Sequence, residues 1–217
     1  MILHRNTVSD NLWDALILLM REDLLSSFRL VGGTSLSLQM GHRMSVDIDM
    51  FTDSDYDSID FRQIDEFLEQ SFPHVEMGFG GNNSLGKSYF VGTSRLDLVK
   101  LDFFYTDAFV FPMIATEGIR LASKEEIIAM KLEIIGQGGR KKDFWDLYEL
   151  MQDYSLLQMI QFYGKRYPYG FSEAQIIANL TSFEKANDDF DPIFLRNYYW
   201  ELIKLDFEEK VKSEFNK

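Results

Sequence analysis

The sequence predicts an α+β fold, in which a mixed β-sheet flanked by helices is followed by a C-terminal helical region. The first half of the 217 residues alternates between strand and helix periodicity, whereas the apolar patterns after Ser123 are helical. Hydrophobic residues make up 46% of the chain and aromatic residues 15%, which is ample for a folded core. We therefore expect a core domain at residues 1–121 and a helical domain at residues 122–217.

Apolar spacing and turn residues define the elements of the first half. In chain order we expect a helix at 9–26 capped by Ser9, a strand at 28–31, a helix at 34–41, a strand at 46–51, a helix at 60–71, hairpin strands at 75–79 and 88–91 around the loop 80–86, and a strand at 96–105. Helices separate the early strands and a hairpin loop separates later ones, so the sheet is expected to be mixed.

The second half is expected to contain helices only. Ser123 and Glu126 have the spacing of a capping box, with Ser at the N-cap and Glu three residues later, and this predicts a helix at 123–135. The Gly-rich run at 136–139 ends that helix. Further helices are expected at 142–153, 155–163, 172–184 and 193–212.

Charge and composition exclude several classes of protein. The chain has 35 Asp and Glu against 22 Lys and Arg, a formal net charge of −13, which disfavours general affinity for nucleic acid. No apolar run approaches the roughly 18 residues of a membrane span, and the first residues lack a signal-peptide pattern. The absence of cysteine excludes a disulfide framework and a thiolate metal site. We therefore expect a cytoplasmic protein with no membrane partner.

Two carboxylates, Asp47 and Asp49, lie in an apolar strand. Residues i and i+2 of a strand project from the same face, so these carboxylates are side by side while Val46, Ile48 and Met50 point into the core. Like charges at that distance favour a cation between them, and oxygen ligands suit Mg²⁺. The same spacing recurs in polar segments (Asp53/Asp55, Asp55/Asp57 and Asp189/Asp191), where solvated loop acids are the simpler interpretation.

A strand that ends at Gly32 and Gly33 leads directly into a helix. Glycines let the backbone approach a phosphate closely, and the N–H groups at a helix start favour an anion. Thr34 and Ser35 add hydroxyl donors. A tight turn without a ligand is the alternative, but a phosphate site close in sequence to a carboxylate pair suits phosphoryl transfer.

A Gly-Gly element followed after thirteen residues by Asp-Ile-Asp resembles the signature of the polymerase-β-like nucleotidyltransferase superfamily. The strings Gly32-Gly-Thr-Ser-Leu36 and Gly41-His-Arg-Met-Ser-Val-Asp-Ile-Asp-Met-Phe51 resemble the AbiEii/AbiGii toxin-type nucleotidyltransferases. The resemblance extends to Ala129-Met-Lys131 and Lys142-Asp-Phe-Trp-Asp146-Leu-Tyr148, so that matching segments span about residues 30–150.

The resemblance implies roles for several further residues. The superfamily has a third carboxylate on a neighbouring strand, and Asp102 fits that position better than Asp97, which we expect at the surface. Arg43 and Ser45 would be nucleotide-site residues, or else a turn arginine and a solvent-facing serine. Lys131 resembles the family's phosphate-contacting lysine; the alternative is a lysine whose ammonium reaches solvent. Asp143 and Asp146 would contribute to nucleotide binding, or else form an exposed acidic stripe beside Lys142.

Some features depart from the family or stand outside it. Gln137 occupies a position where relatives often have arginine, and Arg140 lies nearby but out of register. The chain is shorter at its C-terminal end than many relatives. The basic and aromatic loop at residues 164–170 could stack on nucleobases, although a structural role is the simpler interpretation.

These expectations combine into a Mg²⁺-dependent nucleotidyltransferase. Asp47, Asp49 and Asp102 would bind the metal, and Gly32, Gly33, Thr34 and Ser35 would hold the phosphates of a nucleoside triphosphate. By resemblance, the acceptor is RNA such as a tRNA end, and the protein is a toxin with a separately encoded antitoxin as partner. Two alternatives are transfer to an aminoglycoside-like small molecule or a protein hydroxyl, and a non-catalytic nucleotide-binding module.

Overall fold

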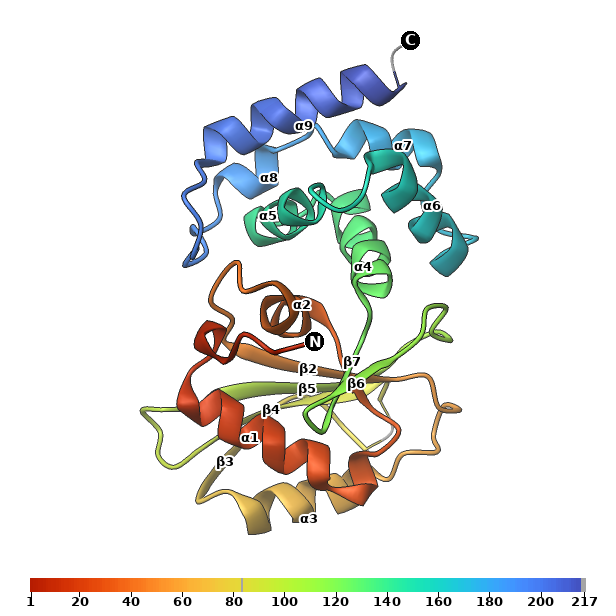
Figure 1. Ribbon diagram of the computed structural model, residues 1–217. Helices are drawn as coiled ribbons and strands as arrows, with labels where there is room; N and C mark the ends of the chain where they lie inside the picture. Colours follow the sequence, from red (N-terminus) through yellow and green to blue (C-terminus); the bar gives the residue numbers. More distant parts are fainter. Residues whose placement is uncertain (83, 216–217) are drawn as a thin grey trace. The chain divides into compact units, whose positions relative to one another are not determined.

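The computed structural model describes residues 1–82 and 84–215. They form two compact units: Met1–Gly41 with Ser45–Ala122, and His42–Met44 with the residues from 123 onward. The first unit holds the sheet and the second is mainly helical, which confirms the predicted α+β class (Figure 1). The predicted hairpin loop at 80–86 includes residue 83, which lies outside the described residues.

A mixed sheet forms the centre of the first unit. In the described part of the chain it has seven strands in the order β3-β4-β5-β2-β1-β7-β6. The bounds are β1 Arg29–Leu30, β2 Asp47–Thr52, β3 His74–Gly80, β4 Gly86–Gly92, β5 Val99–Tyr105, β6 Ile114–Thr116 and β7 Ile119–Leu121. The β2/β5 and β1/β7 pairs are parallel and the other neighbours are antiparallel. The predicted mixed sheet is confirmed, whereas β6 and β7 were not predicted because three residues are too few to show a period.

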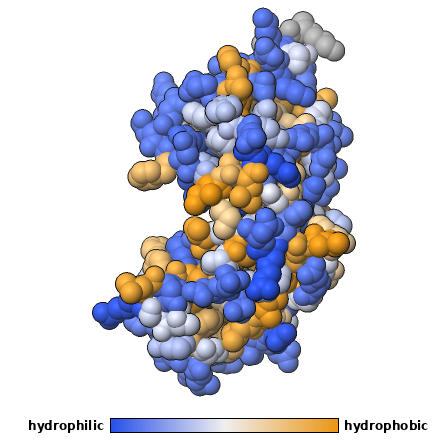
Figure 2. Space-filling view, turned by 60° about the vertical axis from the view of Figure 1, so that its left-hand side comes forward, coloured by the Kyte–Doolittle hydropathy of each residue, from blue (hydrophilic) through white to orange (hydrophobic). Residues whose placement is uncertain are grey.

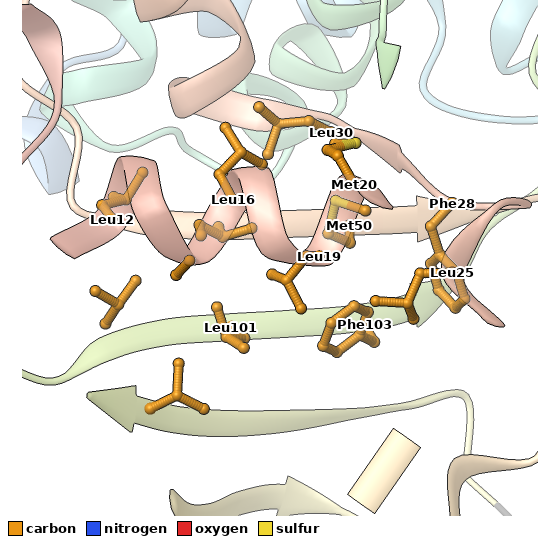
Figure 3. Packing of buried hydrophobic residues seen from close by; sticks show 14 of the residues in the cluster. Leu12, Leu16, Leu19, Met20, Leu25, Phe28, Leu30, Met50, Leu101 and Phe103 are labelled. Carbon is orange, nitrogen blue, oxygen red and sulfur yellow. The ribbon is translucent and has the colours of Figure 1, made fainter. Parts of the chain in front are cut away.

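The core lies between the sheet and two helices, α1 (Asp10–Arg21) and α3 (Phe61–Ser71). Ser9 caps α1 as expected, since its side chain accepts a hydrogen bond from the N–H of Leu12. Figure 3 shows the apolar side chains of α1 against those of the sheet, among them Leu12, Leu16, Leu19, Met50, Leu101 and Phe103. Burial of this many large apolar side chains fixes the pleat of β2 and β5, since only alternate residues can enter the core.

The strand β2 begins one residue later than expected. Ile48 and Met50 are fully buried, as the alternation predicts, but Val46 is 68% exposed and does not enter the core. The correction has a simple cause: Val46 precedes the first residue of the strand, so the period of two does not apply to it. Similarly, β5 starts at Val99, and residues 96–98 belong to the loop before it.

The second unit consists of α4 Lys124–Gly136, α5 Lys141–Leu150, α6 Leu156–Arg166, α7 Glu173–Asn179, α8 Glu184–Asn187 and α9 Trp200–Phe215. Ser123 caps α4 by accepting from the N–H of Glu126, but the predicted capping box is incomplete. The Glu126 carboxylate pairs instead with Arg166 of α6 at 2.5 Å, and both side chains are buried. A buried ion pair takes precedence here over a reciprocal hydrogen bond at the helix end.

Residues 193–199 differ from the expected long helix, and α9 begins only at Trp200. An antiparallel bridge joins Phe194 to Arg43, with backbone hydrogen bonds of 2.8 Å from Met44 to Ile193 and from Leu195 to His42. These contacts hold residues 193–195 extended and place the segment His42–Met44 within the helical unit. The helix expected at 172–184 also stops early, at Asn179.

The surface shown in Figure 2 is coloured by the hydropathy of each residue. The face shown in Figure 2 is mostly hydrophilic, with apolar side chains in separate patches. Of the helices in residues 1–82 and 84–215, none combines the length and the apolar character needed to cross a bilayer.

Candidate active site

Asp47 and Asp49 lie on the same face of β2, opposite the buried side chains of Ile48 and Met50. Both aspartates are partly exposed, as the strand period predicts. The core therefore fixes the backbone beneath them, while their carboxylates remain accessible.

Asp102 lies beside this pair on β5. The parallel register places Asp102 opposite Asp49 and Lys100 opposite Asp47, so the four side chains share one face of the sheet. We call Asp47, Asp49 and Asp102 the acidic triad. The competing acid, Asp97, is partly exposed in the loop before β5, where Thr93 and Ser94 donate hydrogen bonds to it.

Each carboxylate oxygen of Asp102 already has a partner. The Ser88 hydroxyl on β4 donates to Oδ1 at 2.6 Å, and the Lys100 ammonium donates to Oδ2 at 2.5 Å. Partial burial opposes the charged form of Lys100, but the hydrogen bond and charge of Asp102, with the charges of Asp47 and Asp49, raise its pKa above the ordinary value. Neither Ser88 nor Lys100 was predicted from the sequence, because both follow from cross-strand register.

Gly32 gives the carboxylate of Asp49 the space that it occupies. Its φ is +65°, and a Cβ built there would lie 2.5 Å from Oδ2 of Asp49. Any other residue would meet both backbone strain and a collision. Gly32 begins α2 (Gly32–Met40), and its N-cap residue, Val31, makes no side-chain hydrogen bond to the first turn of the helix.

Thr34, Ser35 and Ser45 are buried. The Thr34 hydroxyl donates to the carbonyl of Asp47 and lies 2.7 Å from the hydroxyl of Ser45, while the Ser35 hydroxyl donates to the carbonyl of Ala122 at 3.4 Å. In this arrangement the hydroxyls hold α2 against β2 and the end of β7. A phosphate contact from this segment would therefore come from the backbone of Gly32 and Gly33, which are partly exposed.

The donor chemistry of the acidic triad fits a hard divalent cation, since it supplies carboxylate oxygens alone. As placed, however, no three His, Cys, Asp or Glu side chains within residues 1–82 and 84–215 converge closely enough to hold a metal ion. The triad shares a face of the sheet, and both carboxylate oxygens of Asp102 are engaged, one by Ser88 and the other by Lys100.

The other predicted site residues, Arg43, Lys131, Asp143 and Asp146, form a buried ion cluster in the helical unit. Asp146 accepts from Arg43 Nε at 2.6 Å and Nη2 at 2.9 Å, and from Lys131 at 2.6 Å. Lys131 also donates to Asp143 at 2.5 Å. Both aspartates are fully buried, so the alternative of an exposed acidic stripe is wrong. Lys131 is only 5% exposed, so its ammonium does not reach solvent.

Charge pairing in the buried ion cluster overcomes the cost of burial. Burial alone would raise the pKa of Asp146, but the charges of Arg43 and Lys131, with hydrogen bonds from Arg43 and His42, hold it well below its usual range. Burial likewise opposes the charged form of Lys131, yet Asp143 and Asp146 raise its pKa. All members of the cluster are therefore ionised near neutral pH.

Two contributors to this cluster were not predicted. His42 is fully buried with Nε2 2.8 Å from Asp146, and Arg140 donates to Asp143 at 2.9 Å. His42 precedes Arg43 in sequence, but nothing in the local pattern indicates a partner 104 residues away. The structure thus brings Arg43, Lys131, Asp143 and Asp146 together, and separately brings together the acidic triad and Gly32.

One basic residue of the loop at 164–170, Arg166, has a structural role. Arg166 is buried in the ion pair with Glu126, whereas Tyr169 is fully exposed. The arginine that made this loop a candidate for nucleobase stacking is therefore used inside the helical unit.

Comparisons with known proteins agree with one another. Residues 15–167 match a family model described as nucleotidyl transferase AbiEii toxin, type IV toxin–antitoxin system. The chain is 30% identical over 205 residues to the protein aq_aa25 of Aquifex aeolicus (strain VF5), covering 88% of this chain and 89% of that protein.

Solved structures show a similar fold at low sequence identity. MenT4, a nucleotidyltransferase toxin of Mycobacterium tuberculosis H37Rv, has a TM-score of 0.59 at 16% identity, covering 92% of this chain and 82% of MenT4. JHP933 of Helicobacter pylori has a TM-score of 0.56 at 17% identity, covering 93% of this chain and 88% of JHP933.

Proposed function

Because this chain belongs to the AbiEii family of nucleotidyl transferase toxins, we propose that its acidic triad is the centre at which a nucleoside monophosphate is moved from a triphosphate to an acceptor hydroxyl. Family membership makes the chain a nucleotidyltransferase, which replaces the alternative of a non-catalytic module. The observation that supports this location is the register of β2 and β5, which sets Asp49 beside Asp102 and within one strand period of Asp47.

Nucleotidyltransferases of this kind generally use a divalent metal. We propose Mg²⁺, held by Asp47, Asp49 and Asp102, since all three offer the carboxylate oxygens that Mg²⁺ prefers. When bound, the ion would neutralise charge that develops on the phosphate oxygens. Gly32 contributes by leaving room for the Asp49 carboxylate.

The remaining chemistry belongs to the chain itself. The N-cap residue of α2, Val31, makes no side-chain cap, and we propose that phosphate oxygens of the triphosphate accept from N–H groups at the start of this helix. The acceptor oxygen forms a bond to the α-phosphorus, the bond from that phosphorus to the bridging oxygen breaks, and pyrophosphate leaves with the electron pair. Asp102 takes the proton of the acceptor hydroxyl.

In the helical unit we assign Asp143 and Asp146 a supporting role. Both are fully buried and engaged by cations, so they act by holding Lys131 and Arg43 rather than by touching a nucleotide. Removing Asp146 would take from buried Arg43 the carboxylate with which it is paired, whereas removing Asp143 would leave Lys131 paired with Asp146 alone.

RNA, such as a tRNA end, is our first candidate for the acceptor, in keeping with the toxin family. The net charge of −13 favours a second candidate, a cationic small molecule such as an aminoglycoside, because an acidic surface attracts cations and repels phosphate backbones. A protein hydroxyl is the third candidate. The type IV toxin–antitoxin family further implies a separately encoded antitoxin.

A labelling experiment tests the proposal. The protein is incubated with Mg²⁺, each α-labelled nucleoside triphosphate in turn, and total RNA, a panel of aminoglycosides or a protein extract. We expect label in one acceptor class, and we expect Asp47→Asn to reduce labelling by at least about a thousandfold. Asp55→Asn is the matched control, because Asp55 is an exposed acid of the loop after β2. Full activity in folded Asp47→Asn would refute the assignment.

A further inference from the structure

Lys100 is a cation placed among the three carboxylates of the acidic triad. Its ammonium donates to Oδ2 of Asp102 at 2.5 Å, and its Cα is paired with that of Asp47 across the β2/β5 register. The charges of Asp47 and Asp49 act on it as well as that of Asp102. Three carboxylates on one face of a sheet repel one another, so a cation among them stabilises the fold when no metal is present.

The two partners of Asp102 differ in what they do when a metal ion arrives. The Ser88 hydroxyl is neutral, and a carboxylate that accepts from it at Oδ1 still has lone pairs for a metal. The ammonium of Lys100 is charged and lies against Oδ2, the other oxygen. A divalent cation and an ammonium cannot share these carboxylates without strong repulsion.

We propose that Lys100 is a positioning residue that stands in for the divalent cation in the metal-free protein and is displaced from Asp102 when the metal binds. This inference rests on the proposed metal site at the acidic triad. Lys100 and Ser88 together engage both carboxylate oxygens of Asp102, which a metal ion would have to share.

Displacement requires no movement through the core. The Lys100 side chain is 38% exposed and that of Asp102 is 15% exposed, so the ammonium can move into solvent by rotation of its own flexible chain. Binding of the metal then breaks one ion pair, that between Lys100 and Asp102. Lys100 therefore sets the metal affinity below what three free carboxylates would have.

Metal binding to the whole chain tests the displacement without any measurement of activity. Mn²⁺ affinity is measured by calorimetry or by electron paramagnetic resonance in wild type, Lys100→Met and Lys100→Arg. We expect Lys100→Met, which keeps much of the length but removes the charge, to bind Mn²⁺ about tenfold more tightly. Lys100→Arg keeps a competing cation and should bind within about threefold of wild type.

Two further variants make the comparison specific. Arg95→Met removes the same charge from the same unit at an exposed loop position and should leave the Mn²⁺ affinity unchanged. Asp47→Asn should lose Mn²⁺ binding, which would show that the measured ion is at the acidic triad.

Thermal unfolding adds an independent measurement. In EDTA, Lys100→Met should melt below wild type, and saturating Mn²⁺ should raise its melting temperature more than that of wild type.

The outcomes separate this inference from the proposed function. If wild type binds Mn²⁺ through Asp47 but Lys100→Met binds with equal or weaker affinity, Lys100 does not compete and this inference fails alone. If neither protein binds Mn²⁺, the proposed metal site fails and this inference fails with it. Tighter binding in Lys100→Met together with a larger Mn²⁺-induced stabilisation supports the displacement.

Discussion

The acidic triad and the buried ion cluster both combine aspartates with basic side chains, but their charge balance and burial are opposite. On the sheet, the three carboxylates of the acidic triad are partly exposed, and Lys100 is paired with one of them, Asp102. In the helical unit, two fully buried aspartates are matched by Lys131 and Arg43, with Arg140 beside them. The first arrangement leaves negative charge for a ligand to neutralise, whereas the second is neutralised by the protein itself.

This difference indicates how the two regions respond to mutation. A deficit of positive charge at a partly exposed face is a property of a binding site and costs little stability, because water solvates the excess charge. A balanced set of buried ions contributes to the fold, and removal of one partner leaves an uncompensated charge in the interior. Substitutions on the sheet should therefore affect ligand binding and activity, and substitutions in the cluster should affect folding.

The largest expected effect on stability comes from Asp146→Asn. This change removes the charge of the carboxylate paired with Arg43 and leaves Lys131 with Asp143 alone, and we expect the free energy of unfolding to fall by about 3–5 kcal/mol. The measurement is urea unfolding followed by circular dichroism. The control is Asp153→Asn in the same unit, whose half-exposed carboxylate pairs with Lys124 at 2.8 Å and should contribute less than about 1 kcal/mol. Equal effects of the two variants would show that the buried ion cluster contributes no more to stability than an exposed ion pair.

Periodicity and capping were sufficient to predict most of the fold. Alternation in β2, helical spacing in α1 and the N-cap residues Ser9 and Ser123 depend on neighbours within a few residues, so the sequence carries them directly. The helix predicted at residues 193–199 was wrong, because residues 193–195 pair with His42–Met44, about 150 residues away in sequence. Long-range pairing of this kind leaves no local period.

The candidate site, like the fold, was predictable where the signal is local in sequence and not where it depends on strand pairing. The spacing of Asp47 and Asp49 is a local signal, and the choice of Asp102 required the family resemblance because the register between β2 and β5 cannot be read from spacing. Lys100 and Ser88 become visible only once that register is known. The roles of the predicted residues in catalysis stay predictions, to be decided by the experiments proposed here.

Two glycine substitutions in the sheet unit, at Gly32 and at Gly118, test whether Gly32 shapes the metal site. Gly32→Ala places a Cβ 2.5 Å from Oδ2 of Asp49 at a φ of +65°, and we expect a loss of about 3 kcal/mol with weakened Mn²⁺ binding. Gly118→Ala is the matched control, since its φ of +78° gives similar backbone strain but no atom lies within 4 Å of its Cβ. The control should lose about 1 kcal/mol and keep its metal affinity. If both variants bind Mn²⁺ like wild type, Gly32 does not shape the site.

Lowering the pH should reduce the stability of the protein through the buried ion cluster, because Asp146 takes up a proton. The pKa of Asp146 is lowered by folding, so its contribution is fully present above the unfolded pKa of about 4 and is lost as the pH falls through the lower folded value. Between pH 5 and pH 3 we expect wild type to lose about 1–2 kcal/mol more than Asp146→Asn. Urea midpoints at the two pH values measure this difference. Parallel losses in both proteins would show that folding does not lower the pKa of Asp146.

The smallest expected effects come from two serine substitutions, one of which should lower activity and the other stability. Ser88→Ala removes the donor to Oδ1 of Asp102 and should lower kcat/KM about fivefold, equivalent to about 1 kcal/mol, with little change in stability. Ser172→Ala removes the N-cap of α7 in the helical unit and should cost about 1 kcal/mol of stability while leaving kcat/KM unchanged. Kinetics with the labelled acceptor and thermal unfolding measure the two quantities. Because each variant removes one hydroxyl of similar energy, an activity loss in Ser172→Ala as large as that in Ser88→Ala would show that the helical unit also sets the geometry of transfer.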